Sequence, residues 1–121
     1  MAKTDNSIDY IELRSTDIAA TKRFYSEAFG WEWVDYGPDY ASFTGAGVDG
    51  GVRTDESSSE PSPRPAVPSA LVVLYAADLE AAEARVRAAG GTIAQPIFSF
   101  PGGRRFHFLD PSGNELAVWS E

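Results

Sequence analysis

The stretch that decides the fold is IDYIELRSTDIAATKRFYSEAFGW, residues 8–31, because its pattern returns as ALVVLYAADLEAAEARVRAAGG, residues 70–91. Each stretch begins with apolar residues at strand spacing, passes an aspartate into a helical pattern, and ends at glycine. The aspartates are Asp17 and Asp78, so the repeated unit spans about sixty residues and occurs twice. A solenoid has shorter and more numerous repeats. The sequence therefore predicts two copies of one βα-plus-β module.

Strand patterns follow each predicted helix. The strand at 92–100 contains Pro96, which cannot donate a ladder hydrogen bond, so we expect it to lie at a sheet edge or to bend. DPSGN, residues 110–114, predicts a turn before the last strand. The predicted strands after the helices are Trp31–Val34, Tyr40–Thr44, Gly50–Arg53, 92–100, 104–110 and 115–119. The expected order is βαβββ in each half.

A stretch rich in serine, proline and glutamate, residues 54–68, separates the halves and predicts a linker. We expect a single domain over residues 1–121, with a first module at 7–53 and a second at 69–121. A chain of this length is large enough for one core but not for two independent ones. The modules must therefore share a core, within one chain or between two.

The first strand alternates, with Ile11 and Leu13 on one face and Tyr10, Glu12 and Arg14 on the other. Its second face is polar and aromatic rather than plainly solvent-facing. Thr16 or Asp17 can cap the helix that follows, and Gly30 supplies its left-handed end. Trp31 and Trp33 are two residues apart, so their side chains share one face of a strand. We expect them to pack in the core or in a dimer interface rather than to line a cavity.

Composition restricts the partners. The formal net charge is −8, which argues against nucleic acid, because phosphate binding needs a basic face. With no cysteine, disulfides, thiolate nucleophiles and thiolate metal sites are all excluded. No apolar run reaches the length of about 20 residues that spans a bilayer, and the N-terminus lacks the apolar stretch of a secretory signal. We expect a cytoplasmic protein without a membrane partner.

The two decisive motifs resemble those of the vicinal oxygen chelate superfamily, also called the glyoxalase, bleomycin-resistance and dioxygenase superfamily. They are DIAATKRFYSEAFGW, residues 17–31, and FHFLDPSGNELAVW, residues 106–119. Phrases such as YGPDYASF also resemble a branch described as predicted enzymes related to lactoylglutathione lyase. The resemblance implies an α+β fold in which two βαβββ modules form a curved mixed sheet around a cup-shaped cavity. It also implies a homodimer, since modules of this family often pair between chains.

In metal-using members of the family, four side chains from the first and last strands of each module bind a divalent ion. The first of these ligands is a histidine in the family, and the resemblance aligns Tyr10 with its position. Leu71 occupies the corresponding position in the second module. The final glutamate falls at Ala117, and the remaining position falls between Arg53 and Glu56, where Asp55 or Glu56 could stand. Leucine and alanine cannot coordinate a metal, and tyrosine is an uncommon ligand for hard divalent ions. We therefore expect no metal at the family site and no other cofactor.

The strand faces that carry these positions should line the cavity. Their residues are mainly aromatic with a few charged groups, which is typical of a pocket for a small organic molecule. The candidate ligand-binding residues are Tyr10, Glu12, Tyr40, Ser42, Leu71, Val73, Tyr75, Arg105, His107, Glu115, Ala117 and Trp119. Arg14 shares the face of Tyr10.

Two of these residues, His107 and Glu12, are the candidate general bases. Glu12 and Glu115 could instead form ion pairs with Arg14 or Arg105, which is the commoner role of such residues.

Three functions remain open. The first is a metal-free protein that binds a small organic molecule. The second is an enzyme of the lyase, isomerase or dioxygenase type, using acid–base residues or a metal relocated to His107, Glu12 and Glu115. The third is an interaction module whose own aromatic side chains fill the cavity. Whether the chain is an enzyme is not decided by its sequence.

Overall fold

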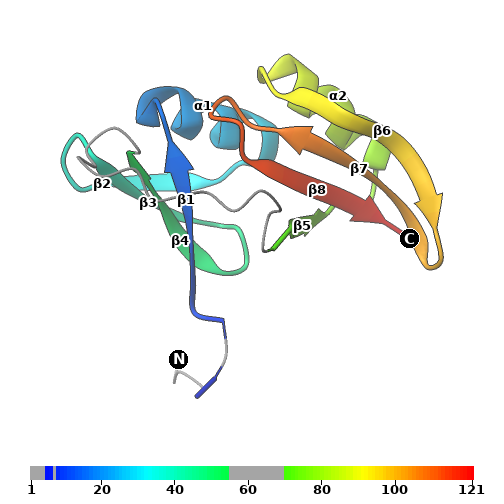
Figure 1. The fold of residues 1–121 in the computed structure, drawn as a ribbon, viewed down its shortest axis with the longest axis horizontal. Coiled ribbons are helices and arrows are strands. Elements are labelled where there is room, and N and C mark those ends of the chain that lie inside the picture. The colour runs from blue at the N-terminus through cyan, green and yellow to red at the C-terminus, as the bar shows by residue number, and fades with distance from the viewer. Residues whose placement is uncertain (1–4, 7, 55–69) are drawn as a thin grey trace.

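The computed structural model describes residues 5–6, 8–54 and 70–121. Its element order is βαβββ twice, as the repeat predicts (Figure 1). The elements are β1 (Tyr10–Ser15), α1 (Ile18–Phe29), β2 (Glu32–Asp35), β3 (Tyr40–Thr44), β4 (Asp49–Thr54), β5 (Val72–Tyr75), α2 (Leu79–Ala88), β6 (Thr92–Phe100), β7 (Gly103–Leu109) and β8 (Glu115–Ser120). Thr54 ends β4, and the rest of the predicted linker lies outside the described residues.

The four strands of each module form one mixed sheet, and the strand order is the same in both. The orders are β1-β4-β3-β2 and β5-β8-β7-β6. In each sheet the first strand of the module pairs in parallel with the last, and the other neighbours are antiparallel. Both helices lie along the same side of the molecule, at the top of the view in Figure 1. The sequence repeat is therefore also a repeat of topology.

The residues predicted to cap the helices do so in the structure. The Asp17 side chain accepts a hydrogen bond from the backbone N–H of Ala20 at 3.0 Å, and Asp78 does the same for Ala81. Gly30 takes the left-handed conformation, with φ of 75°, which ends α1. Neither helix of the described part of the chain is long and apolar enough to cross a membrane.

The strand that contains Pro96 lies at the outer edge of its sheet, as predicted. Its pairing with β7 shifts register between Ile93 and Gln95 and again between Gln95 and Phe98. Pro96 falls inside the second of these shifts. An edge strand can accommodate a residue without an N–H because only one of its sides is hydrogen-bonded.

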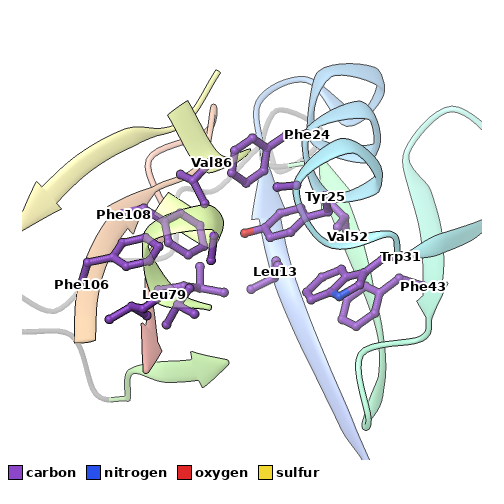
Figure 2. Close-up of a cluster of buried hydrophobic side chains, with 14 residues drawn as sticks. Leu13, Phe24, Tyr25, Trp31, Phe43, Val52, Leu79, Val86, Phe106 and Phe108 are labelled. Carbon is purple, nitrogen blue, oxygen red and sulfur yellow. The ribbon is translucent and has the colours of Figure 1, made fainter. Parts of the chain in front are cut away.

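One hydrophobic core joins the modules. Phe24 and Tyr25 project from α1 toward Phe106 and Phe108 of β7, as Figure 2 shows. The rings of Phe24 and Phe108 lie 5.8 Å apart, centre to centre. Removing a buried Phe side chain from such a core typically costs about 3–5 kcal/mol. The modules therefore share a core within one chain.

Trp31 belongs to this core rather than to a cavity wall. Its ring is stacked between those of Tyr25 and Phe43, at centroid distances of 4.5 and 4.4 Å. Trp33 is half-buried and packs against the same cluster. The core packing expected for this pair of tryptophans is observed.

The DPSGN turn also connects the modules through polar contacts. The buried Asp110 carboxylate accepts a hydrogen bond from the Tyr25 hydroxyl at 2.9 Å. The Asn114 side-chain amide donates to the carbonyl oxygen of Arg14 at 2.7 Å, and the Thr16 N–H donates to the Ser112 hydroxyl at 3.0 Å. We call this set of contacts the clasp. It holds the turn before β8 against the junction of β1 and α1.

Burial raises the pKa of Tyr25 well above its usual value, and the charge of Asp110 and the hydrogen bond to it raise the pKa further. The Tyr25 hydroxyl therefore remains protonated at neutral pH and donates to the carboxylate. The Asp110 carboxylate also accepts from the backbone N–H groups of Ser112 and Asn114, each at 2.9 Å. The clasp thus depends on a well-satisfied buried carboxylate.

Candidate functional site

Side chains of β1, β3 and β4 that point away from the core form a surface that we call the first inner face. On β1, Leu13 is buried in the core, whereas Tyr10 and Glu12 alternate with it and are exposed. In register, Glu12 lies beside Gly51, and Gly51 lies beside Ser42. The predicted residues Tyr10, Glu12, Tyr40 and Ser42 are therefore on one surface.

Two tyrosines meet over a glycine in this face. The hydroxyls of Tyr10 and Tyr40 are within hydrogen-bonding distance of each other above Gly51. A Cβ at Gly51 would lie 2.3 Å from the Tyr40 hydroxyl and 2.6 Å from that of Tyr10. Only glycine leaves room for this contact, which explains why the second residue of the Gly50-Gly51 pair is glycine.

Desolvation raises the pKa of Tyr40 well above its usual value, and the Tyr10 hydroxyl and the nearby Glu12 carboxylate raise it further. The Tyr40 hydroxyl is therefore neutral at physiological pH. Glu12 also pairs with Arg53, whose Nε lies 3.3 Å from a carboxylate oxygen. The ion pair of Glu12 is therefore formed with Arg53 rather than with the expected Arg14.

A pocket of about 460 Å³ opens on the first inner face. Its described lining combines three tyrosines with smaller groups: Tyr10, Tyr36, Tyr40, Ser42, Phe43, Thr44, Asp49 and Gly50. Pockets for small molecules usually have volumes of about 300–1,000 Å³. The pocket is large enough for a metabolite-sized ligand.

Sequence reasoning missed five of these residues: Tyr36, Phe43, Thr44, Asp49 and Gly50. Tyr36 follows the end of β2 and precedes Gly37-Pro38-Asp39, whose residue types are typical of a turn. The register gives a clearer signal for Asp49, because it pairs with Tyr10 across β1 and β4 and so shares its face. This signal can be used only when the pairing of β1 with β4 is known.

The other predicted residues lie on the side of the second sheet that faces away from the hydrophobic core. We call this side the second inner face. Two rows of neighbours cross it. Val73, Ala117 and His107 form one row, and Tyr75, Trp119 and Arg105 form the next. Its predicted members are Leu71, Val73, Tyr75, Arg105, His107, Glu115, Ala117 and Trp119.

His107 is buried in this face and contacts Glu115. Only 6% of its surface is exposed, and Nδ1 lies 2.9 Å from a carboxylate oxygen of Glu115. Its ring lies 5.8 Å from that of Phe98. Nε2 is buried and has no hydrogen-bond partner among the described residues. A ring nitrogen in this state could bond to a ligand atom or to a water molecule.

Arg105 has no carboxylate partner in the described part of the chain. Its guanidinium lies over the rings of Phe98 and Phe100, at 5.3 and 5.4 Å, and its buried Nε is not hydrogen-bonded. The adjacent Arg104 points elsewhere and forms a hydrogen-bonded ion pair with Glu80 of α2. The expected pairing of Glu115 with Arg105 is not observed, since Glu115 contacts His107 instead.

The predicted site residues thus fall into two groups on two separate sheets. The pocket on the first inner face contains Tyr10, Tyr40 and Ser42 but no predicted residue of the second inner face. Large apolar side chains are exposed on both faces. They include Tyr10, Val34, Tyr36, Leu71, Val73 and Tyr75, of which Tyr36 and Tyr75 are 65% and 54% exposed.

The positions that the family resemblance assigns to a metal do not fit a divalent ion. Leu71 and Ala117 have no donor atoms, and the Tyr10 hydroxyl is engaged with Tyr40. At the fourth position, Asp55 and Glu56 lie outside the described residues. Within the described ranges, no three histidine, aspartate or glutamate side chains come together. In particular, Glu12 lies on the first sheet, whereas His107 and Glu115 lie on the second.

Comparison with known proteins supplies the family. Residues 7–118 match the model of the Glyoxalase/Bleomycin resistance protein/Dioxygenase superfamily. The chain is 32% identical over 124 residues to the anthracycline biosynthesis protein DauV of Streptomyces sp. (strain C5), covering 91% of this chain and 45% of DauV. It is 26% identical over 117 residues to CFP32 of Mycobacterium tuberculosis, covering 92% of this chain and 44% of CFP32. The chain therefore spans less than half the length of these relatives.

The fold agrees with that of solved structures. A glyoxalase-related enzyme from Fulvimarina pelagi superimposes with a TM-score of 0.78 at 24% identity, covering 96% of this chain and 88% of that one. At this identity the likeness concerns the fold alone, and it confirms the predicted α+β arrangement of two βαβββ modules. Because the family model matches residues 7–118, nearly the whole chain, the chain belongs to the Glyoxalase/Bleomycin resistance protein/Dioxygenase superfamily.

Proposed function

We propose that this protein binds a small organic molecule on its inner faces and does so without a divalent metal ion. The observation that carries the proposal is the 460 Å³ pocket on the first inner face, whose lining contains three tyrosines and includes one of the positions that the family resemblance assigns to a metal ligand. Tyr10 occupies the first such position and contributes to the wall of this pocket. Aromatic walls with a few polar groups are typical of sites for small organic molecules.

The distribution of exposed apolar side chains supports a site formed by two chains. Tyr10 and Tyr36 are exposed on one inner face, and Val73 and Tyr75 are exposed on the other. Large exposed apolar patches on a protein usually mark an interface or a binding groove. We propose a homodimer in which the first inner face of one chain faces the second inner face of its partner. The ligand would lie between the two faces.

A thermal-shift screen of metabolites and antibiotics in the presence of EDTA tests the binding proposal. A ligand that binds the folded state raises the unfolding temperature. We expect hits whose effect is lost in Tyr10→Ala and His107→Ala, both checked for folding by circular dichroism. Glu27→Ala, an exposed change on α1, should bind as the unmodified protein does. Hits that appear only after addition of a divalent ion would contradict the proposal.

Mixing the two variants tests whether the site spans two chains. Tyr10 lies on the first inner face and His107 on the second. If the faces of different chains form each site, a mixed dimer has one site with both residues intact. Random exchange then restores about a quarter of the binding sites. A site formed within one chain stays damaged in every mixture.

One observation favours a second candidate function, general-base catalysis. Glu115 can hold His107 with its proton on Nδ1, so that the Nε2 lone pair is available to accept a proton. The Nε2 atom would take a proton from a C–H next to a carbonyl of the ligand, and Glu115 would stabilise the imidazolium formed. The test is deuterium incorporation from D2O into a ligand found by the screen, followed by NMR. Exchange that slows in Glu115→Gln supports catalysis, and no exchange leaves binding alone.

A further inference from the structure

We infer that the pocket on the first inner face recognises a positively charged organic ammonium group. This inference rests on the proposed binding function and names the chemical class of the ligand. It is carried by three tyrosine rings and one carboxylate that share a single pocket. Tyr10, Tyr36 and Tyr40 supply the rings, and Asp49 supplies the carboxylate.

The aromatic walls have the arrangement that attracts a cation. The rings of Tyr36 and Tyr40 lie 6.5 Å apart and are inclined at 56°, so they form two sides of a corner rather than a stack. Tyr10 contacts Tyr40 through its hydroxyl and contributes a third wall from β1. The face of a tyrosine ring carries a negative quadrupole that attracts an ammonium group within about 6 Å. Several rings around one volume form an aromatic cage.

The charged residues around the pocket also favour a positively charged ligand. Asp49 lies beside Tyr10 in the register of β1 and β4, and its carboxylate forms no ion pair or hydrogen bond with a described residue. No described residue of the lining is basic. Arg53, the register partner of Tyr40, is paired with Glu12. The net charge of the chain is −8, which also favours the approach of a cation.

The state of the tyrosine hydroxyls agrees with a cage for an organic cation. The raised pKa of Tyr40 keeps its hydroxyl neutral, and its contact with Tyr10 directs both hydroxyls toward each other above Gly51. The ring faces, rather than ionised oxygens, therefore form the walls. Ser42 and Thr44 add neutral hydroxyls that can accept hydrogen bonds from a primary ammonium group. An anionic ligand would find no basic partner among the described residues of this lining.

Paired NMR titrations test the inference with choline and 3,3-dimethyl-1-butanol, which have nearly the same shape but differ in charge. We expect choline to shift the backbone signals around Asp49 and Gly50 and to bind at least about tenfold more tightly than the neutral alcohol. Tyr36→Leu keeps an apolar wall but removes the ring, so it should weaken choline and leave the alcohol unchanged. Asp49→Asn should weaken choline binding roughly three- to tenfold.

Asp39→Asn is the matched control for Asp49→Asn. It removes one negative charge from the exposed turn between β2 and β3, outside the pocket lining, and should leave choline binding unchanged. Equal affinity for the two probes would overturn the ammonium inference while leaving the binding proposal intact. A failure of every library compound to bind would instead remove the binding proposal itself. Choline binding that weakens as protein concentration rises would show that a second copy of the chain excludes choline from the cage instead of enclosing it, which also contradicts the inference.

Discussion

Tyr25→Phe removes one hydroxyl from the clasp and measures how strongly that contact joins the modules. Tyr25 is completely buried, and its hydroxyl donates to the Asp110 carboxylate at 2.9 Å. A hydrogen bond to a charged group contributes about 1.5–3 kcal/mol. Asp110 keeps its bonds from Ser112 and Asn114, so it is not left without partners. We therefore expect a loss of about 2 kcal/mol in the free energy of unfolding.

The assay is urea unfolding at pH 7, followed by far-UV circular dichroism. For a chain of this size, the expected loss corresponds to a fall of roughly 5–10 °C in the midpoint of thermal unfolding. Tyr75→Phe is the matched control, because its hydroxyl donates to Glu121 at 3.2 Å on the exposed surface. That variant should be indistinguishable from the unmodified protein. If Tyr25→Phe costs no more than Tyr75→Phe, the clasp does not stabilise the fold as argued.

Four further results are expected from unfolding and amide-exchange measurements. Gly51→Ala should cost roughly 1–3 kcal/mol, because its Cβ meets tyrosine hydroxyls that can move. Gly50→Ala should cost more in the same urea titration, because its Cβ would lie 2.1 Å from the backbone oxygen of Ile11; equal costs would contradict this. The folded-state pKa of Tyr25 is raised, so its contribution is complete below about pH 10 and declines as the pH rises further. The unmodified protein should therefore lose stability more steeply than Tyr25→Phe between about pH 9 and 11, and parallel curves would refute this. Asn114→Ala removes the bond to the Arg14 carbonyl and should speed amide exchange at the end of β1, whereas unchanged exchange would exclude that role.

The order of elements could be predicted from the sequence because the signals are local. The aspartate caps, the glycine that ends α1, and the alternation in β1 each depend on neighbours within a few residues. The edge position of β6 follows in the same way from Pro96. Each of these features is decided by the chemistry of one short segment.

The division of the site into two faces could not be predicted in this way. Alternation places Tyr10 and His107 on outward faces, but only the strand pairing shows that these faces belong to different sheets. The same limit explains why Asp49 was missed. The clasp was also missed, because DPSGN has the pattern of an ordinary turn, and its partners Tyr25 and Arg14 lie far away in sequence.

Calorimetric titration of chelator-treated protein with Zn2+, Mn2+ and Ni2+ tests whether the inner faces, proposed to hold an organic ligand without a divalent ion, bind a metal. The positions of the family ligands include Leu71 and Ala117, which have no donor atoms. We predict no one-to-one binding of any of these ions at micromolar concentration. One ion bound per chain, with binding abolished by His107→Ala or Glu12→Ala, would contradict that proposal and establish a metal site on these faces.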